Sequence, residues 1–206
     1  MPGLAAPADA CSRFARAVGA FVLCVAIIAC GSPPPPNRDI QATYDSKTGR
    51  LTQLTLDSNH DGKPDTWSYM EGARVLRIEI DNNNDGLVDR WEYYGPDQKL
   101  EKVGFSRAND GKVDAWAYQA PDGTVARIEM SIRRDGKVDR TEFYEKGTMV
   151  RVEEDTDHDG RIDKWDTYEN GALASVAFDT THRGVADRRL IYRPDGSLDR
   201  VETPTP

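Results

Sequence analysis

The stretch DNNNDGLVDRWEYYGPDQKLEKVGF, residues 81–105, combines three patterns in one short segment. It opens with an Asp/Asn-rich run that contains Gly86, continues with the aromatic run Trp91 to Tyr94, and ends in a second short run after a Gly-Pro-Asp turn. Aromatic and β-branched residues favour a pleated, half-buried surface. Gly, Asn and Asp between two such runs are hairpin signals. This stretch therefore predicts a β-hairpin preceded by an acidic loop.

The same unit recurs along the chain. Units start at Asp57, Asp81, Ser106, Ser131, Asp155 and Asp179, with spacings of 24 or 25 residues. Residues 41–56 match only the second half of a unit, so the array is expected to open with a partial repeat. Such a repeat stabilises itself by stacking neighbours, because one hairpin cannot bury its own apolar face.

The repeat predicts a mainly β fold for residues 39–204, a tandem β-hairpin array with its Asp-rich loops along one edge. The expected form is an antiparallel meander of about 13 strands, or a coiled sheet, with the Gly turns on the opposite edge. Strands lie ~4.8 Å apart, so successive loops should lie about 9–10 Å apart. The pattern leaves open whether the sheet stays open, coils or closes on itself.

The acidic loops have the spacing that calcium requires. Calcium takes six to eight oxygen ligands, and a short loop supplies them at positions 1, 3, 5, 7 (a backbone carbonyl) and 9, with Gly at position 6 for the sharp turn. Three loops fit this pattern in full. Their predicted ligands are Asp57, Asn59, Asp61, Lys63 and Asp65; Asp81, Asn83, Asp85, Leu87 and Asp89; and Asp155, Asp157, Asp159, Arg161 and Asp163.

These loops resemble those of EF-hand proteins and, more closely, the Asp-rich loops of dockerin and thrombospondin type 3 repeats. The resemblance implies a further ligand at position 12, which is Glu92 in the second unit, Asp166 in the fifth and Ser68 in the first. It covers the loops only, since β-type runs stand where an EF-hand has helices. The hairpin halves are more similar to MORN-type repeats. An EF-hand switch that moves helices is therefore not expected.

The other three loops have lost ligands. Residues 106–114 keep two carboxylates, residues 131–139 place Arg133 at position 3, and residues 179–187 place Arg183 at position 5. We expect the last two not to bind metal and the first to bind weakly or not at all. Arg183 is expected to bridge to a carboxylate of a neighbouring loop. The simpler alternative for all six loops is that Asp-Gly and Asn-Asp form turns without any metal.

The N-terminal segment reads as an export signal. Arg13 and Arg16 precede an apolar run over residues 17–29, which is too short to span a bilayer and has the length of a signal peptide core. The run ends Ile-Ile-Ala-Cys30, which resembles the lipobox of bacterial lipoproteins. The resemblance implies a signal peptide over residues 1–29, a lipidated Cys30 and a proline-rich tether over 30–38.

The resemblance also bears on location, because aspartate after the lipidated cysteine retains enteric lipoproteins at the inner membrane. Gly31 stands there instead, which favours the outer membrane, with the periplasmic or surface side left open. Cysteines occur only at Cys11, Cys24 and Cys30, so the repeats hold no disulfide, and metal is a natural substitute.

Composition narrows the function further. The net charge of −8 and the absence of a basic stripe argue against nucleic acid as a partner. No catalytic motif occurs, so an enzyme is not expected. Zinc held by histidines from separate loops is disfavoured, since no cysteine is available to help. These histidines are His60, His158 and His182, all at loop position 4.

Aromatic residues recur at fixed positions of the unit, as in Trp67 and Tyr69. This ladder is expected to form the core, with a glycan-binding platform as the alternative reading. The leading hypothesis is a calcium-binding, lipid-anchored structural or interaction module of the cell envelope. Its partner would be an envelope protein or glycan, and its oligomeric state is open. The alternatives are a glycan- or peptidoglycan-binding module and a calcium-responsive sensor or adhesin.

Overall fold

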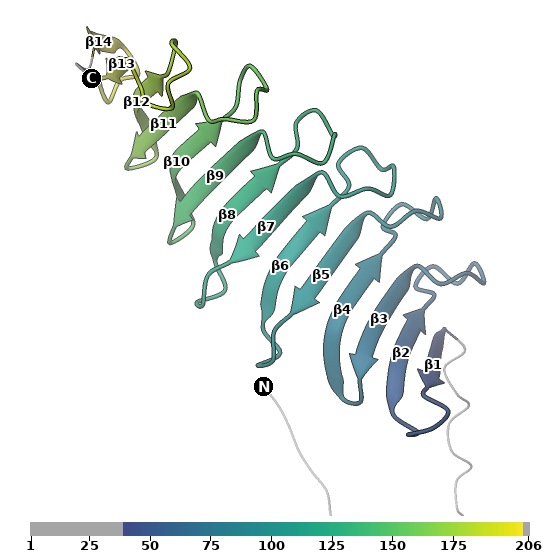
Figure 1. The fold of residues 1–206 in the computed structure, drawn as a ribbon. Helices are drawn as coiled ribbons and strands as arrows, with labels where there is room; N and C mark the ends of the chain where they lie inside the picture. Colours follow the sequence, from purple (N-terminus) through teal and green to yellow (C-terminus); the bar gives the residue numbers. More distant parts are fainter. Residues whose placement is uncertain (1–38, 204–206) are drawn as a thin grey trace, which may run out of the picture. The chain divides into compact units, whose positions relative to one another are not determined.

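A computed structural model describes residues 39–203 as a single antiparallel sheet with no helix (Figure 1). Every strand pairs only with its neighbours in the sequence. The strands are β1 (Ile40–Tyr44), β2 (Leu51–Leu56), β3 (Thr66–Glu71), β4 (Arg74–Ile80), β5 (Arg90–Tyr94), β6 (Leu100–Phe105), β7 (Ala115–Gln119), β8 (Val125–Met130), β9 (Arg140–Glu145), β10 (Thr148–Glu154), β11 (Lys164–Glu169), β12 (Ala172–Phe178), β13 (Arg188–Tyr192) and β14 (Leu198–Glu202). The predicted β-hairpin meander is confirmed, and the sheet stays open.

The predicted signal peptide, Cys30 and tether lie outside the described residues. Within residues 39–203, no helix is long and apolar enough to cross a membrane.

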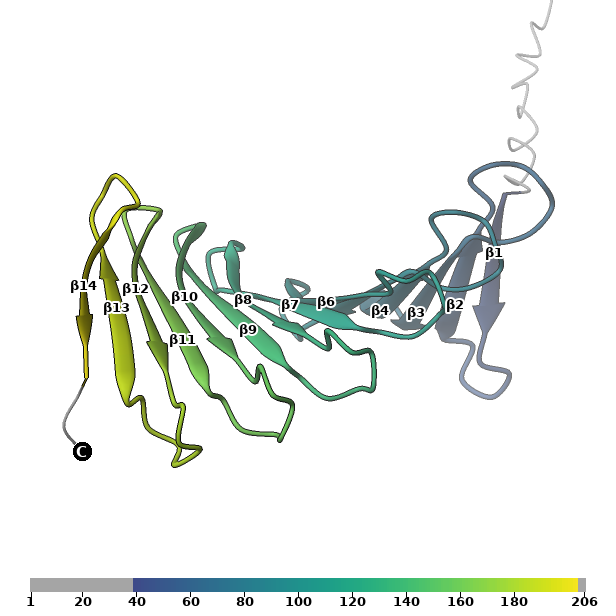
Figure 2. The same ribbon diagram turned by 90° about the horizontal axis from the view of Figure 1, so that it is seen from above.

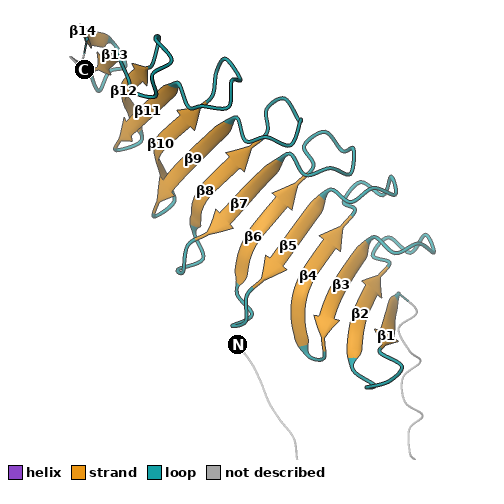
Figure 3. Ribbon diagram, in the orientation of Figure 1, coloured by secondary structure: helices purple, strands orange, loops and turns teal. Residues whose placement is uncertain are grey.

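The two kinds of connection lie on opposite edges of the sheet, as the repeat predicts (Figure 3). The long acidic loops follow the even-numbered strands, and the short turns follow the odd-numbered ones. Two of the turns have the two consecutive positive φ angles that a tight hairpin requires. They are Lys146-Gly147, with φ of 50° and 79°, and Asn170-Gly171, with φ of 51° and 80°. No connection between the described strands is longer than nine residues, so each strand pairs with the next.

The structure has 14 strands rather than the predicted 13 or so. The extra strand is β1, whose residues pair with β2 from Ile40↔Leu56 to Tyr44↔Leu51. Asp39 to Tyr44 occupy the place of loop position 9 and the first strand of a unit, but Gln41 and Thr43 stand where other units have Trp and Tyr. The missing aromatics hid the strand from the sequence pattern. The opening partial repeat is therefore a full hairpin.

Alternation along each strand gives the sheet two different faces. One face, here called the aliphatic face, carries a row of residues two strands apart that includes Val103, Val152 and Val176. These three are only 3%, 1% and 7% exposed, so they pack between the units as predicted. Fully burying such a side chain contributes roughly 1.5–3 kcal/mol, and this contribution is made in full at these three valines. Figure 2 shows the sheet curving along its length.

The opposite face, here called the aromatic face, carries Trp67, Trp91, Trp116 and Trp165, and all four are half-buried. The prediction that the aromatic ladder forms the buried core is therefore wrong, because these rings stay partly exposed. Strands between the aromatic ones insert charged residues into the ladder, as where Arg77 pairs in register with both Tyr69 and Tyr93. A single layer leaves this face without a covering sheet in the described part of the chain, so the rings pack against charged side chains instead.

Candidate metal-binding loops

All six acidic loops share one backbone. Position 4 has a positive φ of 53–64° and the Gly at position 6 a positive φ of 74–93° in every loop. Left-handed backbone is costly for residues with a Cβ atom, and Asn and His tolerate it better than most. Positive φ angles at both position 4 and position 6 turn the chain sharply and bring the two ends of the loop together. The residues at position 4 are His60, Asn84, Asn109, Arg134, His158 and His182.

The base of each loop is tied into the sheet. The N–H of position 9 donates to the carbonyl just before the loop, as Asp65 does to Leu56 at 2.9 Å. The carbonyl of position 9 then accepts from position 1 of the next loop, as Asp65 does from Asp81 at 2.8 Å. The strand ladder thus continues one step into every loop. Positions 1 and 9 are consequently fixed by the sheet, whereas positions 3 and 5 extend toward solvent.

The three full loops share a second set of hydrogen bonds that orients the predicted ligands. In the loop of residues 155–163, the carboxylate of Asp155 accepts the N–H groups of Asp159 and Gly160, at 3.2 and 2.8 Å. The side chains at positions 3 and 5 accept from positions 5 and 7, at 3.1 Å for Asp157 and 2.8 Å for Asp159. The same bonds occur in the loops of residues 57–65 and 81–89. Backbone N–H groups therefore hold the acidic side chains around the inside of each loop.

In the fifth unit this arrangement brings three carboxylates together. One oxygen each from Asp155, Asp157 and Asp163 lies within 4.8 Å of the others, so this acidic cluster could hold a metal ion. Calcium–oxygen distances are about 2.3–2.6 Å, so two ligands of one ion lie at most about 5 Å apart. Carboxylates this close repel one another unless a cation or hydrogen-bond donors compensate. Positions 1, 3 and 9 are thus brought together as the loop pattern predicts.

Positions 1 and 9 are the most buried of the loop positions, with Asp65 and Asp89 at position 9 and Asp81 and Asp155 at position 1 only 4–7% exposed. Burial alone would raise the pKa of Asp65, but hydrogen bonds from the hydroxyl and N–H of Ser58 bring it below its ordinary value. Asp89 is 7% exposed, and its Oδ1 has no hydrogen-bond partner. A buried oxygen without a partner is costly and calls for an explanation such as a bound ion. Asp114 and Asp187 of the degraded loops have the same feature, so it marks position 9 rather than a binding loop.

The remaining predicted ligands fall into two groups. Position 7 (Lys63, Leu87 and Arg161) lies at the loop turn, where its N–H donates to the carboxylate of position 5 at 2.8 Å in all three full loops. Position 12 lies inside a strand.

Glu92 accepts from Arg90 and from the hydroxyl of Tyr94, at 2.7 and 2.6 Å. Asp166 pairs with Lys164 at 3.2 Å. Neither residue belongs to an acidic cluster of metal-binding size in the described part of the chain.

In the degraded loops, arginine side chains bond to polar groups of their own loop. Arg133 bonds to Asp135 at 2.9 Å in the fourth loop, and this pair lowers the pKa of Asp135. Arg107 bonds to Asp114 at 2.8 Å in the third loop. In the sixth loop Arg183 donates to Thr181 of its own loop at 3.0 Å. In the third and fourth loops, an arginine thus pairs with a carboxylate that the full loops keep for the predicted metal site.

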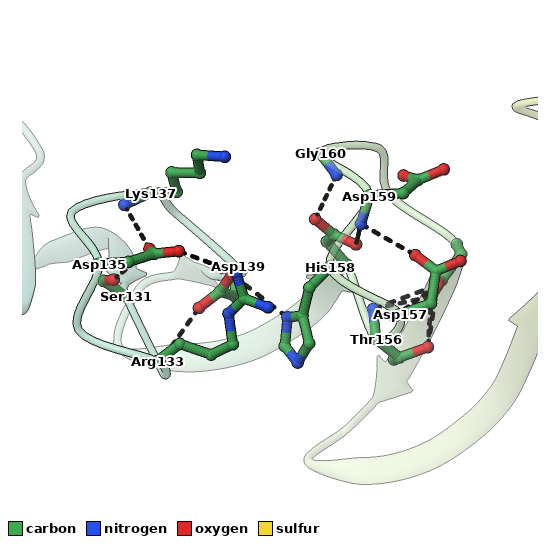
Figure 4. A network of polar contacts seen from close by, with 12 residues as sticks. Ser131, Arg133, Asp135, Lys137, Asp139, Thr156, Asp157, His158, Asp159 and Gly160 are labelled. Carbon is green, nitrogen blue, oxygen red and sulfur yellow. Dashed lines mark hydrogen bonds and ion pairs between the residues drawn. The ribbon is translucent and has the colours of Figure 1, made fainter.

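The loops also contact one another through histidine, which the sequence reading missed (Figure 4). His182 Nδ1 lies 3.0 Å from Asp157 of the preceding loop, and His158 Nδ1 lies 3.4 Å from Asp139. The second contact has the distance of an ion pair without hydrogen-bond geometry. The expected bridge between loops is therefore made by His182 and not by Arg183. Left-handed backbone at position 4 points that side chain out of its own loop, which is a signal that composition alone does not give.

The aromatic face carries a further pattern that was missed. Arg77, Arg127 and Arg151 lie 4.0, 3.8 and 4.1 Å from the ring centres of an aromatic residue on the preceding strand. Each arginine also pairs with the glutamate two residues later, at 2.8–3.1 Å. The tripeptide Arg-Ile/Val-Glu at these three places is the signal that could have found it. The chain therefore has charged residues where a stacked core was expected.

No family model matches this chain, and no curated protein matches it. Solved structures with partial similarity to this chain include TarM (15% identity, TM-score 0.39, 48% of this chain and 19% of that one). Another is the accessory secretory protein 1, 2 and 3 structure from Streptococcus pneumoniae (14% identity, TM-score 0.35, 59% and 20%). A third is the GtfA/B complex bound to UDP and GlcNAc (13% identity, TM-score 0.21, 84% and 25%). This chain thus spans a quarter or less of the length of each.

Proposed function

We propose that this protein is a calcium-binding, lipid-anchored structural or interaction module of the bacterial cell envelope, and not an enzyme. The observation that carries the calcium proposal is the convergence of Asp155, Asp157 and Asp163 within 4.8 Å. The loops of residues 57–65 and 81–89 share its backbone angles and its internal hydrogen bonds. Hard carboxylate and amide oxygens without sulfur are the donor set that calcium prefers.

Calcium would act on the loop edge of the sheet. It would neutralise the carboxylates of a full loop and draw positions 3 and 5 toward the buried positions 1 and 9. Since position 9 is hydrogen-bonded to position 1 of the next loop, an ordered loop also restrains its neighbour. Binding energy then becomes folding energy. Affinity is expected in the range of extracellular modules, ~10⁻⁴ to 10⁻³ M or somewhat tighter.

The calcium proposal is tested by calorimetric titration of the purified full chain, with thermal melts in calcium and in chelator. About three sites and a large rise in melting temperature are expected. Asp159→Ala should remove one site, because position 5 loses its oxygen ligand as well as its charge. Asp135→Ala, the same position in a degraded loop, is the matched control and should leave the number of sites unchanged. If calcium gives no binding heat and does not shift the melting temperature, the loops are turns that do not bind calcium.

The lipid-anchor proposal rests on the Ile-Ile-Ala-Cys30 sequence and the proline run after it. Membrane fractionation of cells that express the full chain tests it. Cys30→Ser should move the protein out of the outer-membrane fraction, and Cys24→Ser should not. Unchanged membrane association of Cys30→Ser would contradict the anchor.

A glycan- or peptidoglycan-binding module is the second candidate. Trp67, Trp91, Trp116 and Trp165 are half-buried on a face that no second layer of the described chain covers. Aromatic rings on an open face can stack on the apolar C–H faces of sugar rings. Tryptophan emission with peptidoglycan fragments tests this candidate. Quenching by the fragments would support this candidate if Trp91→Ala reduces it. Tyr94→Ala, on the opposite face, should leave the quenching unchanged.

A further inference from the structure

The two outer strands of the sheet expose apolar residues that the rest of the array buries. Val201 on β14 occupies the same place in its unit as Val176 and Val152, judged by the pairing of all three with the preceding strand. Val201 is 55% exposed, whereas Val176 is 7% and Val152 is 1% exposed. Unlike Val176 and Val152, Val201 has no following strand in the described sheet. Burial at this position therefore depends on the next strand.

A cleft beside Val201 has the position and the apolar lining expected of a binding site for a further strand. It measures about 560 Å³ and lies on the aliphatic face at the β14 edge. Apolar side chains from three strands line it together with the stem of an arginine. The lining residues are Phe178, Thr180, Arg188, Leu190, Val201 and Thr203.

The first strand, β1, at the opposite end of the sheet, has the properties needed to bind in this cleft. All five residues of β1 are exposed, and the strand contains no charged residue and no proline. Its apolar residues Ile40 and Tyr44, 47% and 59% exposed, lie on the aliphatic face. An exposed, uncharged edge strand is a ready template for pairing, and proteins usually block such edges with charge or proline.

The strand order sets which edges can join. Inside the array, each even-numbered strand pairs with the next odd-numbered one across an acidic loop, as β12 does with β13. At the two ends of the sheet, the free edges belong to β14, an even-numbered strand, and to β1, an odd-numbered strand. Pairing β14 of one copy with β1 of another therefore repeats the pairing found inside the array. In the register of β12 and β13, Val201 would face Ala42, Glu202 would face Gln41, and Ile40 would reach the cleft. Apolar residues of both strands then lie on one face.

From this complementarity we propose that copies of the protein associate head to tail, with β1 of one copy adding to β14 of another. The contact is heterologous, so each copy keeps one free end and the sheets extend into short linear assemblies. One pair of strands buries less surface than a standard stable interface, so the association should be weak and depend on protein concentration. The inference does not depend on calcium binding or on lipid attachment.

Cross-linking in a defined register tests the proposal. Gln41→Cys with Glu202→Cys is introduced into the full chain with Cys11, Cys24 and Cys30 changed to Ser. The two positions lie on the first and last strands of this open 14-stranded sheet, thirteen strand spacings or roughly 60 Å apart along its curved surface, so a disulfide within one chain is excluded. Oxidation should give covalent dimers, trimers and longer species on a non-reducing gel. Facing residues of an antiparallel pair lie about 4.5–5.5 Å apart, which a disulfide can bridge.

Two controls make the result specific. Ala42→Cys with Glu202→Cys places the sulfurs on opposite faces and should give at least tenfold less product. Val201→Lys, added to the first pair, should reduce the product by a similar factor. Val185→Lys, at a loop residue that is 54% exposed, should not. No multimers, equal product from the Ala42→Cys pair, or equal dimer from either single cysteine would overturn the proposal.

Discussion

The fourth and fifth acidic loops have nearly the same backbone and quite different contents. Position 4 has φ of 57° in Arg134 and 64° in His158, and the glycine at position 6 has φ of 85° in Gly136 and 93° in Gly160. In the fourth loop, Arg133 bonds to Asp135. In the fifth loop, three carboxylates lie close together. The fold of a loop thus depends on its glycine and on its ties to the sheet. Its capacity to gather carboxylates depends separately on the side chains at positions 1 and 3, because positions 5 and 9 are aspartate in both loops.

The largest expected effect comes from calcium itself. At a hundredfold excess over the dissociation constant, each occupied site contributes about 2.7 kcal/mol of stability. Three sites that unfold together with the sheet would contribute roughly 8 kcal/mol, and less if the array unfolds in parts. Hydrogen–deuterium exchange should slow in residues 57–65, 81–89 and 155–163 when calcium is added. Equal slowing in residues 131–139 and 179–187 would show that the two kinds of loop do not differ.

Restoring ligands to a degraded loop should have the next largest effect. Ser131→Asp with Arg133→Asp gives the fourth loop carboxylates at positions 1, 3, 5 and 9. Because its backbone already matches that of the fifth loop, we expect a fourth calcium site with an affinity within about tenfold of the others. Such a site would add about 2.7 kcal/mol at a hundredfold excess of calcium. Calorimetry counts the sites.

Arg133→Ala is the control for this repair, since it removes the cation without adding a ligand. It should leave three sites. If Arg133→Ala alone creates the fourth site, then the arginine blocks the loop and the missing ligands matter little.

The fold followed from the sequence because the repeat leaves few choices. Loops of nine residues and turns of a few residues force each strand beside the next, so topology, loop edge and turn edge could all be predicted. The first strand was missed because Gln41 and Thr43 lack the aromatic signal, although they pair normally. Openness of the sheet could not be predicted, since it depends on the summed twist and curvature of many strands.

The side-chain contacts were harder to predict than the fold. Ligand positions in a loop follow from spacing, and the structure brings Asp155, Asp157 and Asp163 together accordingly. Contacts between units depend on register, as for Arg77 between two tyrosines, and on backbone handedness, as for His182. Neither property can be read from one unit alone. The calcium ligands themselves stay a prediction.

Glycine at position 6 should matter equally in both kinds of loop. No atom lies within 4 Å of a Cβ atom placed on Gly136 or Gly160, so alanine would meet no steric clash there. The cost of Gly136→Ala and Gly160→Ala is then the backbone strain of a positive φ, about 1–2 kcal/mol each. Denaturant unfolding in chelator should show similar losses for both. A much smaller loss for Gly136→Ala would mean that the degraded loop tolerates another backbone.

The smallest effect tests position 12, where a full and a degraded loop carry the same residue. Glu92 bonds to the hydroxyl of Tyr94, and Glu142 bonds to that of Tyr144, at 2.6 and 2.7 Å. Burial, followed by these bonds, raises the pKa of each tyrosine to about 12. A raised pKa stabilises the fold fully below the ordinary value near 10, and this contribution is lost as pH rises through about 12.

Calcium should leave both tyrosine titrations unchanged if Glu92 stays with Arg90 and Tyr94. If Glu92 leaves the strand to bind calcium, the pKa of Tyr94 should fall toward 10, while that of Tyr144 stays near 12. Ultraviolet titration of Tyr94→Phe and Tyr144→Phe, with and without calcium, assigns each step. We expect no change in either tyrosine, because Glu92 already has two partners at hydrogen-bond distance. A calcium-dependent fall at Tyr94 alone would make Glu92 a ligand, and the full loops would then differ from the degraded ones at position 12 as well.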